Sequence, residues 1–223
     1  MTGREAVPVE GAGPTTEVDG RGGPGGPGTI LAGLAAPLVT REGWGAEPAV
    51  GWPVEHATLR AVVVHHTGTR NDDPDPLAML RRVQHFHAQE RGWGDIGYSF
   101  VVLEDGRVAE GREGSAVAVA PTAVVAGHAF GHNPGTLGVA LAGRFHHTMP
   151  TVAAWDALVD LVTVVCRAAR LDPLGGPVPL GNGRTVPAVV GGHRHVGTTP
   201  CPGDTLTRAL PSLAAAVHDR LAP

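Results

Sequence analysis

The stretch Leu59-Arg60-Ala61-Val62-Val63-Val64-His65-His66 decides the fold class. Its short β-branched run predicts a buried strand that ends at two histidines. Tyr98–Leu103 and Thr136–Ala142 are similar apolar runs and predict two further strands. Glu104–Arg107 directly follows one of them and predicts a hairpin turn, with a returning strand from Val108.

Three other segments have the spacing of an amphipathic helix. Pro150–Leu171 is the clearest, because its apolar residues fall on one stripe, and Asp204–Leu221 repeats the pattern. A shorter helix opens at Asp75-Pro76. Its inward face is predicted to hold Leu77, Leu80, Val83 and Phe86. Because strands and helices are mixed along the chain, we expect an α/β fold, a single domain with a central mixed β-sheet flanked by helices.

Composition excludes several classes of protein. A chain of 223 residues with 42% hydrophobic residues is long enough to bury one core. Its formal charge of −4, with neutral histidines, gives no basic surface for nucleic acid. The sequence has no run of about 18 apolar residues, so we expect no membrane span. The chain has no lysine, and all 17 of its Lys/Arg positions are arginine, which is typical of GC-rich genomes.

The N-terminal segment differs from the rest of the chain. Gly20–Gly28 is a Gly/Pro-rich run without periodicity that offers nothing to a core. We expect residues 1–36 to be disordered and residues 37–223 to form the domain, so that the first 28 or so residues are dispensable. The sequence as given shows no basic segment followed by an apolar one, and therefore no visible signal peptide.

Two histidines and one cysteine have the chemistry of a metal site. His65 lies at the end of the first predicted strand, and His193 and Cys201 lie eight residues apart near the C-terminus. Two imidazoles and one thiolate leave one tetrahedral position of zinc open for water, as a catalytic zinc requires. Spacing alone does not settle the set, because His195 could replace His193. Cys166 falls on the apolar helical stripe, so we expect a free, buried thiol and no disulfide to Cys201.

Five motifs, in order between about residues 40 and 210, resemble those of one enzyme family. They are Arg41-Glu42-Gly43-Trp44-Gly45-Ala46, Val64-His65-His66-Thr67, Gly92-Trp93-Gly94-Asp95-Ile96-Gly97-Tyr98, Gly127-His128-Ala129 with Asn133 and Gly138-Val139, and Gly192-His193-Arg194 through Cys201-Pro202-Gly203. The chain thereby resembles the type-2 N-acetylmuramoyl-L-alanine amidases, the family of phage T7 lysozyme and the peptidoglycan recognition proteins. His195 is a departure, because the family often carries Asp there, and it leaves open what supports His193.

The resemblance implies a role for each site residue. It selects His65, His193 and Cys201 as the ligands of one Zn²⁺ per chain. It places Tyr98 beside the zinc water and Thr199 as a donor facing the scissile carbonyl, although a turn next to Pro200 would also explain this hydroxyl. The residues that it implies for substrate binding are His66, Trp93, Arg112, His128 and Asn133.

Two of these substrate-binding residues have structural alternatives. Alternation along the strand points His66 to the face opposite His65, which favours a structural role. Arg112, in Glu110-Gly111-Arg112, could brace the sheet instead of contacting a substrate.

The activity implied by the resemblance is hydrolysis of the amide between the lactyl group of N-acetylmuramic acid and L-alanine of peptidoglycan. The expected partner is peptidoglycan or muropeptides, with the protein acting as a monomer outside the cell or in the cell wall, or staying in the cytoplasm until release. Two alternatives stay open. One is a non-catalytic peptidoglycan-binding module, which in this family characteristically lacks the zinc cysteine. The other is a cytoplasmic muropeptide-recycling amidase, which usually has Asp in the place of Cys201. A phage-type endolysin would share the chemistry.

Overall fold

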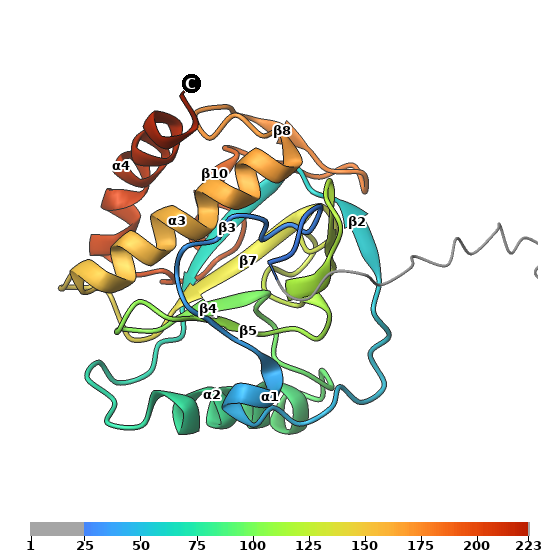
Figure 1. The fold of residues 1–223 in the computed structure, drawn as a ribbon, viewed down its shortest axis with the longest axis vertical. Coiled ribbons are helices and arrows are strands. Elements are labelled where there is room, and N and C mark those ends of the chain that lie inside the picture. Colours follow the sequence, from blue (N-terminus) through green and yellow to red (C-terminus); the bar gives the residue numbers. More distant parts are fainter. Residues whose placement is uncertain (1–24, 223) are drawn as a thin grey trace, which may run out of the picture.

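The computed structural model describes residues 25–222 and has the predicted α/β fold, with a central mixed sheet between helices (Figure 1). The strand order of this six-stranded sheet is β1-β5-β4-β7-β3-β10. Its strands are β1 (Leu38–Val39), β3 (Ala61–His66), β4 (Phe100–Val102), β5 (Val108–Glu110), β7 (Thr136–Leu141) and β10 (Val190–Gly192). β4, β7, β3 and β10 run parallel to one another, whereas β5 pairs with β4 in the antiparallel direction. The carboxyl ends of β3 and β10 therefore lie at the same edge of the sheet.

Helices cover both faces of the sheet (Figure 1). On one face, which we call the α3 face, lie α3 (Val152–Ala169) and α4 (Asp204–Leu221). On the other, the α2 face, lie α1 (Arg41–Trp44) and α2 (Pro76–His85). The predicted long helices are present, and the N-terminal end of α3 is capped by the Thr151 hydroxyl, which accepts from the Ala154 N–H at 3.1 Å.

Short elements fill the connections around this core. They are two small antiparallel sheets, β2 (His56–Thr58) with β6 (Thr122–Val124) and β8 (Val178–Pro179) with β9 (Thr185–Val186), and the 3-10 turns Ser115–Val117 and His193–His195. None of the helices within residues 25–222 combines the length and the hydropathy needed to cross a bilayer.

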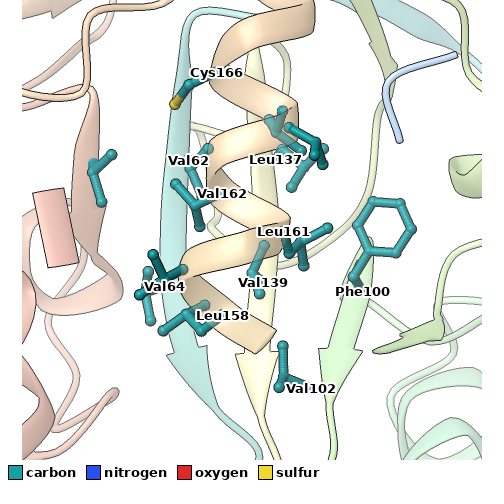
Figure 2. Packing of buried hydrophobic residues seen from close by; sticks show 14 of the residues in the cluster. Val62, Val64, Phe100, Val102, Leu137, Val139, Leu158, Leu161, Val162 and Cys166 are labelled. Atoms are coloured by element: carbon teal, nitrogen blue, oxygen red, sulfur yellow. The ribbon is translucent and has the colours of Figure 1, made fainter. Parts of the chain in front are cut away.

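The α3 face of the sheet is packed with large apolar side chains. Figure 2 shows strand residues meeting one side of α3 across this interface. The labelled strand residues are Val62, Val64, Phe100, Val102, Leu137 and Val139, and the labelled α3 residues are Leu158, Leu161, Val162 and Cys166. Cys166 is buried with a free thiol, as predicted. Full burial of a Val, Leu or Phe side chain stabilises a fold by roughly 1.5–3 kcal/mol, so this face carries much of the stability.

The prediction for the inward face of α2 is wrong at its last member. Phe86 is 45% exposed, and the neighbouring His87 is buried instead. An α-helix has 3.6 residues per turn, so His87, seven residues after Leu80 and four after Val83, shares their face, whereas Phe86 lies about 120° away from Leu80. After His85 the helix continues as one π-helical turn, Phe86–Glu90.

The prediction of a disordered segment through residue 36 is wrong for residues 25–36. Ile30 and Leu31 are fully buried in the core of the α3 face. The Ile30 N–H donates to the Ala118 carbonyl, and the N–H groups of Ala35 and Ala36 both donate to the Asp160 carboxylate of α3 at 2.8 Å. Two apolar residues between glycines are enough to anchor a segment whose composition indicates disorder. The rest of that prediction, on residues 1–24, lies outside the described residues.

Candidate active site

The parallel strands bring His65 and His193 together. His65 is the fifth residue of β3 and points to the α2 face, because the alternating Val62 and Val64 point to the α3 face. His193 directly follows β10, whose Gly192 pairs with Val64. The centroids of the two imidazole rings are 4.5 Å apart.

Cys201 completes a cluster that suits a metal ion. One ligand atom from each of His65, His193 and Cys201 lies within 4.8 Å of the others, the one such group of His, Cys, Asp or Glu ligands found within residues 25–222. The Cys201 Sγ lies 3.7 Å from the His65 Nδ1. Tetrahedral zinc, with Zn–S near 2.3 Å and Zn–N near 2.0–2.1 Å, sets its S and N ligands about 3.6 Å apart. The donor set and its spacing therefore fit zinc.

The protonation of these ligands also favours a metal. Burial lowers the pKa of His65 well below its usual value and lowers that of His193, so both imidazoles are neutral near pH 7 and carry a free lone pair. Burial raises the pKa of the Cys201 thiol to about 11. Binding of a metal cation would therefore release a proton from Cys201.

The loop that carries His193 and Cys201 is closed by Arg194. Its backbone N–H donates to the Cys201 carbonyl at 3.0 Å, and its guanidinium donates to the Pro200 carbonyl and to Asp204 at the start of α4. These contacts hold the ligand-bearing ends of the loop together. His195, the departure from the family motif, accepts the Gly192 N–H on its Nδ1 at 3.2 Å and is exposed, so it supports the backbone before His193.

Tyr98 and Thr199 line the same cavity as the three ligands, a space of about 250 Å³. The Tyr98 ring lies 5.4 Å from the His65 ring, and its hydroxyl is 3.4 Å from the His66 carbonyl. The Thr199 hydroxyl accepts the Cys201 N–H at 3.2 Å, so the turn interpretation of this residue holds. The same hydroxyl keeps its proton available for a substrate.

A second, larger groove of about 530 Å³ adjoins the cavity. The two spaces share Trp93, Gly127, His128 and His193 in their walls. The predicted residues Trp93, His128 and Asn133 all border this groove. Aromatic side chains absent from the prediction, Trp52 and Phe130, also line it, and Phe130 is 95% exposed.

Arg112 does not reach the groove, so its predicted contact with substrate is wrong. It is fully buried, and its guanidinium donates to Asp95 and to the Trp52 and Pro53 carbonyls. Its guanidinium carbon lies 4.4 Å from the centre of the Trp52 ring. Asp95 also pairs with Arg41 at 3.1 Å. These contacts show the alternative, structural role. Arg112 supports Trp52, which lines the groove.

His66 and Asn133 are each tied to the backbone. The His66 Nδ1 accepts the Phe145 N–H at 3.3 Å and its ring faces away from His65, as strand alternation predicts, although the residue borders the cavity. The Asn133 side chain accepts the Ala129 N–H at 2.7 Å and so shapes the loop of His128.

His87 is a cavity residue that sequence reasoning missed. Its ring stacks on Trp93 at 4.8 Å, and its Nδ1 accepts the Gly97 N–H at 3.2 Å. Burial lowers the pKa of His87 to about 4, so the ring is neutral and carries its proton on Nε2. The helical spacing of His87 from Leu80 and Val83, carried from α2 into the following π-helical turn, was the signal that could have found it.

Comparison with known proteins supports the family. The family model described as N-acetylmuramoyl-L-alanine amidase (Amidase_2) matches residues 55–204. The human N-acetylmuramoyl-L-alanine amidase is 36% identical over 186 residues, which cover 79% of this chain and only 29% of the human protein. The chain thus spans under a third of that relative's length.

Solved structures agree with this match. Wild-type PGRP-LB of Drosophila is 30% identical, with a TM-score of 0.62 over 78% of this chain and 92% of that one. Peptidoglycan recognition protein LE in complex with tracheal cytotoxin, a monomeric diaminopimelic acid-type peptidoglycan, is 26% identical, with a TM-score of 0.61 over 81% and 94%. The sequence motifs, the sheet and the matched family model together establish that the chain belongs to the N-acetylmuramoyl-L-alanine amidase family.

Proposed function

We propose that the protein is a zinc-dependent amidase that hydrolyses the bond between the lactyl group of N-acetylmuramic acid and L-alanine in peptidoglycan. The observation that carries the proposal is one cavity that holds the ligand set His65, His193 and Cys201 together with Tyr98 and Thr199. A site that only bound the wall would have no need of three metal ligands beside two hydroxyl donors.

The side chains of the cavity would have different roles in hydrolysis. Zinc, when bound to the two imidazoles and the thiolate, supplies Lewis-acid activation of water and of the scissile carbonyl. Burial raises the pKa of the Tyr98 phenol above its usual range, with a further contribution from Cys201. Tyr98 therefore keeps its proton at neutral pH and acts as a hydrogen-bond donor, not as the base.

Tyr98 and Thr199 would together donate two hydrogen bonds to the amide oxygen of the substrate and stabilise the negative charge that develops there. Thr199, whose oxygen already accepts the Cys201 N–H, offers the second proton. One positioned donor to a developing oxyanion contributes roughly 3–4 kcal/mol in well-studied acyl-transfer sites.

The aromatic groove supports a peptidoglycan partner. Trp52, Trp93 and Phe130 present apolar surface beside the cavity, and Arg91 adds a positive charge to the same wall. A stem peptide carries both apolar and carboxylate groups, so it matches this lining. We propose peptidoglycan or its muropeptide fragments as the ligand of a monomeric protein. The groove alone would equally suit a non-catalytic binding module, so the test must separate binding from cleavage.

The test is product identification. The protein is incubated with purified sacculi and, separately, with soluble muropeptides, each with and without a chelator, and the products are analysed by mass spectrometry. We expect new free L-alanine amino termini while the glycan strands stay intact, and no new amino termini in the presence of the chelator. Sacculi that stay uncut while still binding the protein would support the binding module instead, and cleavage of soluble muropeptides alone would support the recycling activity.

A further inference from the structure

A series of hydrogen bonds runs from His65 through His128, which lies in the wall shared by the cavity and the groove, to Thr136 of β7. The His65 Nε2 lies 3.0 Å from the His128 Nδ1, and the His128 Nε2 lies 3.2 Å from the Thr136 Oγ1. The Thr136 hydroxyl also contacts the carbonyl oxygens of His132 and Asn133. All three side chains are buried, so water does not compete for these bonds.

The two carbonyl groups fix which atom is the donor in each of these hydrogen bonds. A carbonyl oxygen only accepts, so the single proton of the Thr136 hydroxyl is directed to the backbone. The Thr136 Oγ1 must then accept from the His128 Nε2, which therefore carries a proton. Within residues 25–222 the buried His128 ring contacts His65 and the Thr136 hydroxyl and has no carboxylate partner. A buried ring without a counter-ion is neutral and has no second proton.

The protonation of His128 in turn decides which nitrogen of His65 carries the proton. With its proton on Nε2, His128 presents a bare Nδ1 that can only accept, so the His65 Nε2 must be the donor. A neutral His65 then has a bare Nδ1, which is the nitrogen that lies 3.7 Å from the Cys201 Sγ.

We propose that His128 and Thr136 are positioning residues that fix the tautomer and the ring orientation of His65, so that its Nδ1 is preset as the metal ligand. This proposal rests on the zinc site of the proposed function and gives His128 a task other than substrate contact. Hydrogen bonds of this kind to a ligating histidine raise its basicity and hold its ring.

The packing around His128 supports a fixed ring. Gly138 of β7 lies directly beneath it, where an added Cβ would come within 2.3 Å of the His128 Cγ. The ring can lie against the sheet only because this position has no side chain. His65 and His128 also meet edge to face, with centroids 5.0 Å apart.

The first test needs neither zinc nor hydrolysis. Side-chain ¹⁵N–¹H correlation spectra of the metal-free wild-type protein report which nitrogen of each histidine is protonated. We expect the Nε2–H tautomer for both His65 and His128. An Nδ1–H tautomer at His65 would overturn the proposal, whatever the enzyme does to peptidoglycan.

The second test measures zinc affinity by competition with a chromophoric chelator. His128→Leu removes the acceptor and Thr136→Val removes the anchor, and each should weaken zinc binding by about 10–100-fold. His128→Asn keeps an acceptor, and its zinc affinity should stay within about threefold of wild type. Thr136→Ser keeps the hydroxyl, and its zinc affinity should stay within about tenfold. Unchanged zinc affinity in folded Thr136→Val and His128→Leu would overturn the positioning role. If wild type itself bound no zinc, the proposed function would fail, while the tautomer measurement would still decide the hydrogen-bond chain.

Discussion

The two faces of the central sheet use the same strands for opposite purposes. On the α3 face, β7 presents Leu137, Val139 and Leu141 to a dry apolar core. On the α2 face, the intervening positions of β7 are Gly138 and Ala140. The His128 ring packs against Gly138, whereas Ala140 joins a smaller apolar cluster with Trp44 and Leu80. Because side chains alternate along a strand, a glycine at one position makes room for a polar ring on one face while its neighbours pack an apolar core on the other.

Buried polar groups show the same contrast. Near the α2 face, His65, His87, His128 and Asp95 are buried, and each has a hydrogen-bond partner. Between the sheet and α3 the packing is apolar, and Thr163 of that helix bonds within its own helix. Stability and chemistry are therefore separable, and substitutions on the two faces should have different consequences.

The largest contrast is expected between the two cysteines. Cys201→Ala removes one of the three proposed metal ligands, so bound zinc should fall from about one per chain to background and hydrolysis should be lost. Cys166→Ala deletes one buried atom from α3, so it should cost about 1 kcal/mol of unfolding free energy and leave zinc and rate unchanged. Elemental analysis and denaturant unfolding of both variants check this. Comparable zinc loss in both would mean that the two faces are coupled.

The next effect should separate catalysis from metal binding within the α2 face. Tyr98→Phe keeps the ring and removes only the hydroxyl, so the rate of amide hydrolysis should fall by about 10²–10⁴. Zinc content, thermal stability and binding to intact wall should stay close to wild type. Single-turnover assays measure the rate of hydrolysis, and a separate assay measures binding to intact wall. An unchanged rate would leave Thr199 as the remaining donor.

Adjacent residues of β7 allow the sharpest comparison of the faces. Gly138→Ala pushes on the His128 ring, so zinc binding should weaken by about 10–100-fold. Val139→Ala, one position along, opens a cavity against α3, so it should cost about 2 kcal/mol of unfolding free energy with zinc affinity kept. Chelator competition and urea unfolding are the measurements. A reversed pattern would contradict the assignment of roles to the faces.

The anchored N-terminal segment should affect the α3 face alone. A variant that starts at Gly25 should be as stable as the full chain. A variant that starts at Pro37 lacks the buried Ile30 and Leu31 and should lose about 3–6 kcal/mol of unfolding free energy, with zinc affinity of the folded fraction unchanged. Equal stability of the two variants would show that residues 25–36 contribute nothing to the core.

The last predicted effect concerns pH. Burial holds the pKa of His87 near 4 in the folded protein, against about 6.5 when unfolded, so the unfolded state binds more protons between these values. Stability of the metal-free protein should therefore fall as the pH drops from about 6.5 to about 4. His87→Gln should reduce that slope by up to about 1.4 kcal/mol per pH unit. A slope identical to wild type would mean that His87 titrates normally in the fold.

Much of the fold could be predicted from the sequence because its signals are local. The apolar strands, the stripe of Pro150–Leu171 and the five motifs each depend on neighbouring residues, and they led to the α/β sheet and the family. Cys166 could be placed for the same reason, since its helix stripe alone indicates burial.

What could not be predicted depends on contacts between distant residues. Arg112 is buried because Asp95 and the Trp52 carbonyl meet it from other segments, which no spacing reveals. Ile30 and Leu31 are ordered because they pack into the apolar core of the α3 face, although the composition of the segment around them indicates disorder. The link from His65 to Thr136 spans three segments and appears only in three dimensions.

We propose that hydrolysis depends on one metal ion held by His65, His193 and Cys201. The most direct measurement titrates zinc into the stripped, chelator-free protein while release of L-alanine amino termini from sacculi is followed. We expect activity that rises linearly to one equivalent of zinc and then stays constant, with no activity in the Cys201→Ala variant at any zinc concentration. Full activity of the stripped wild-type protein in the presence of a chelator would contradict it.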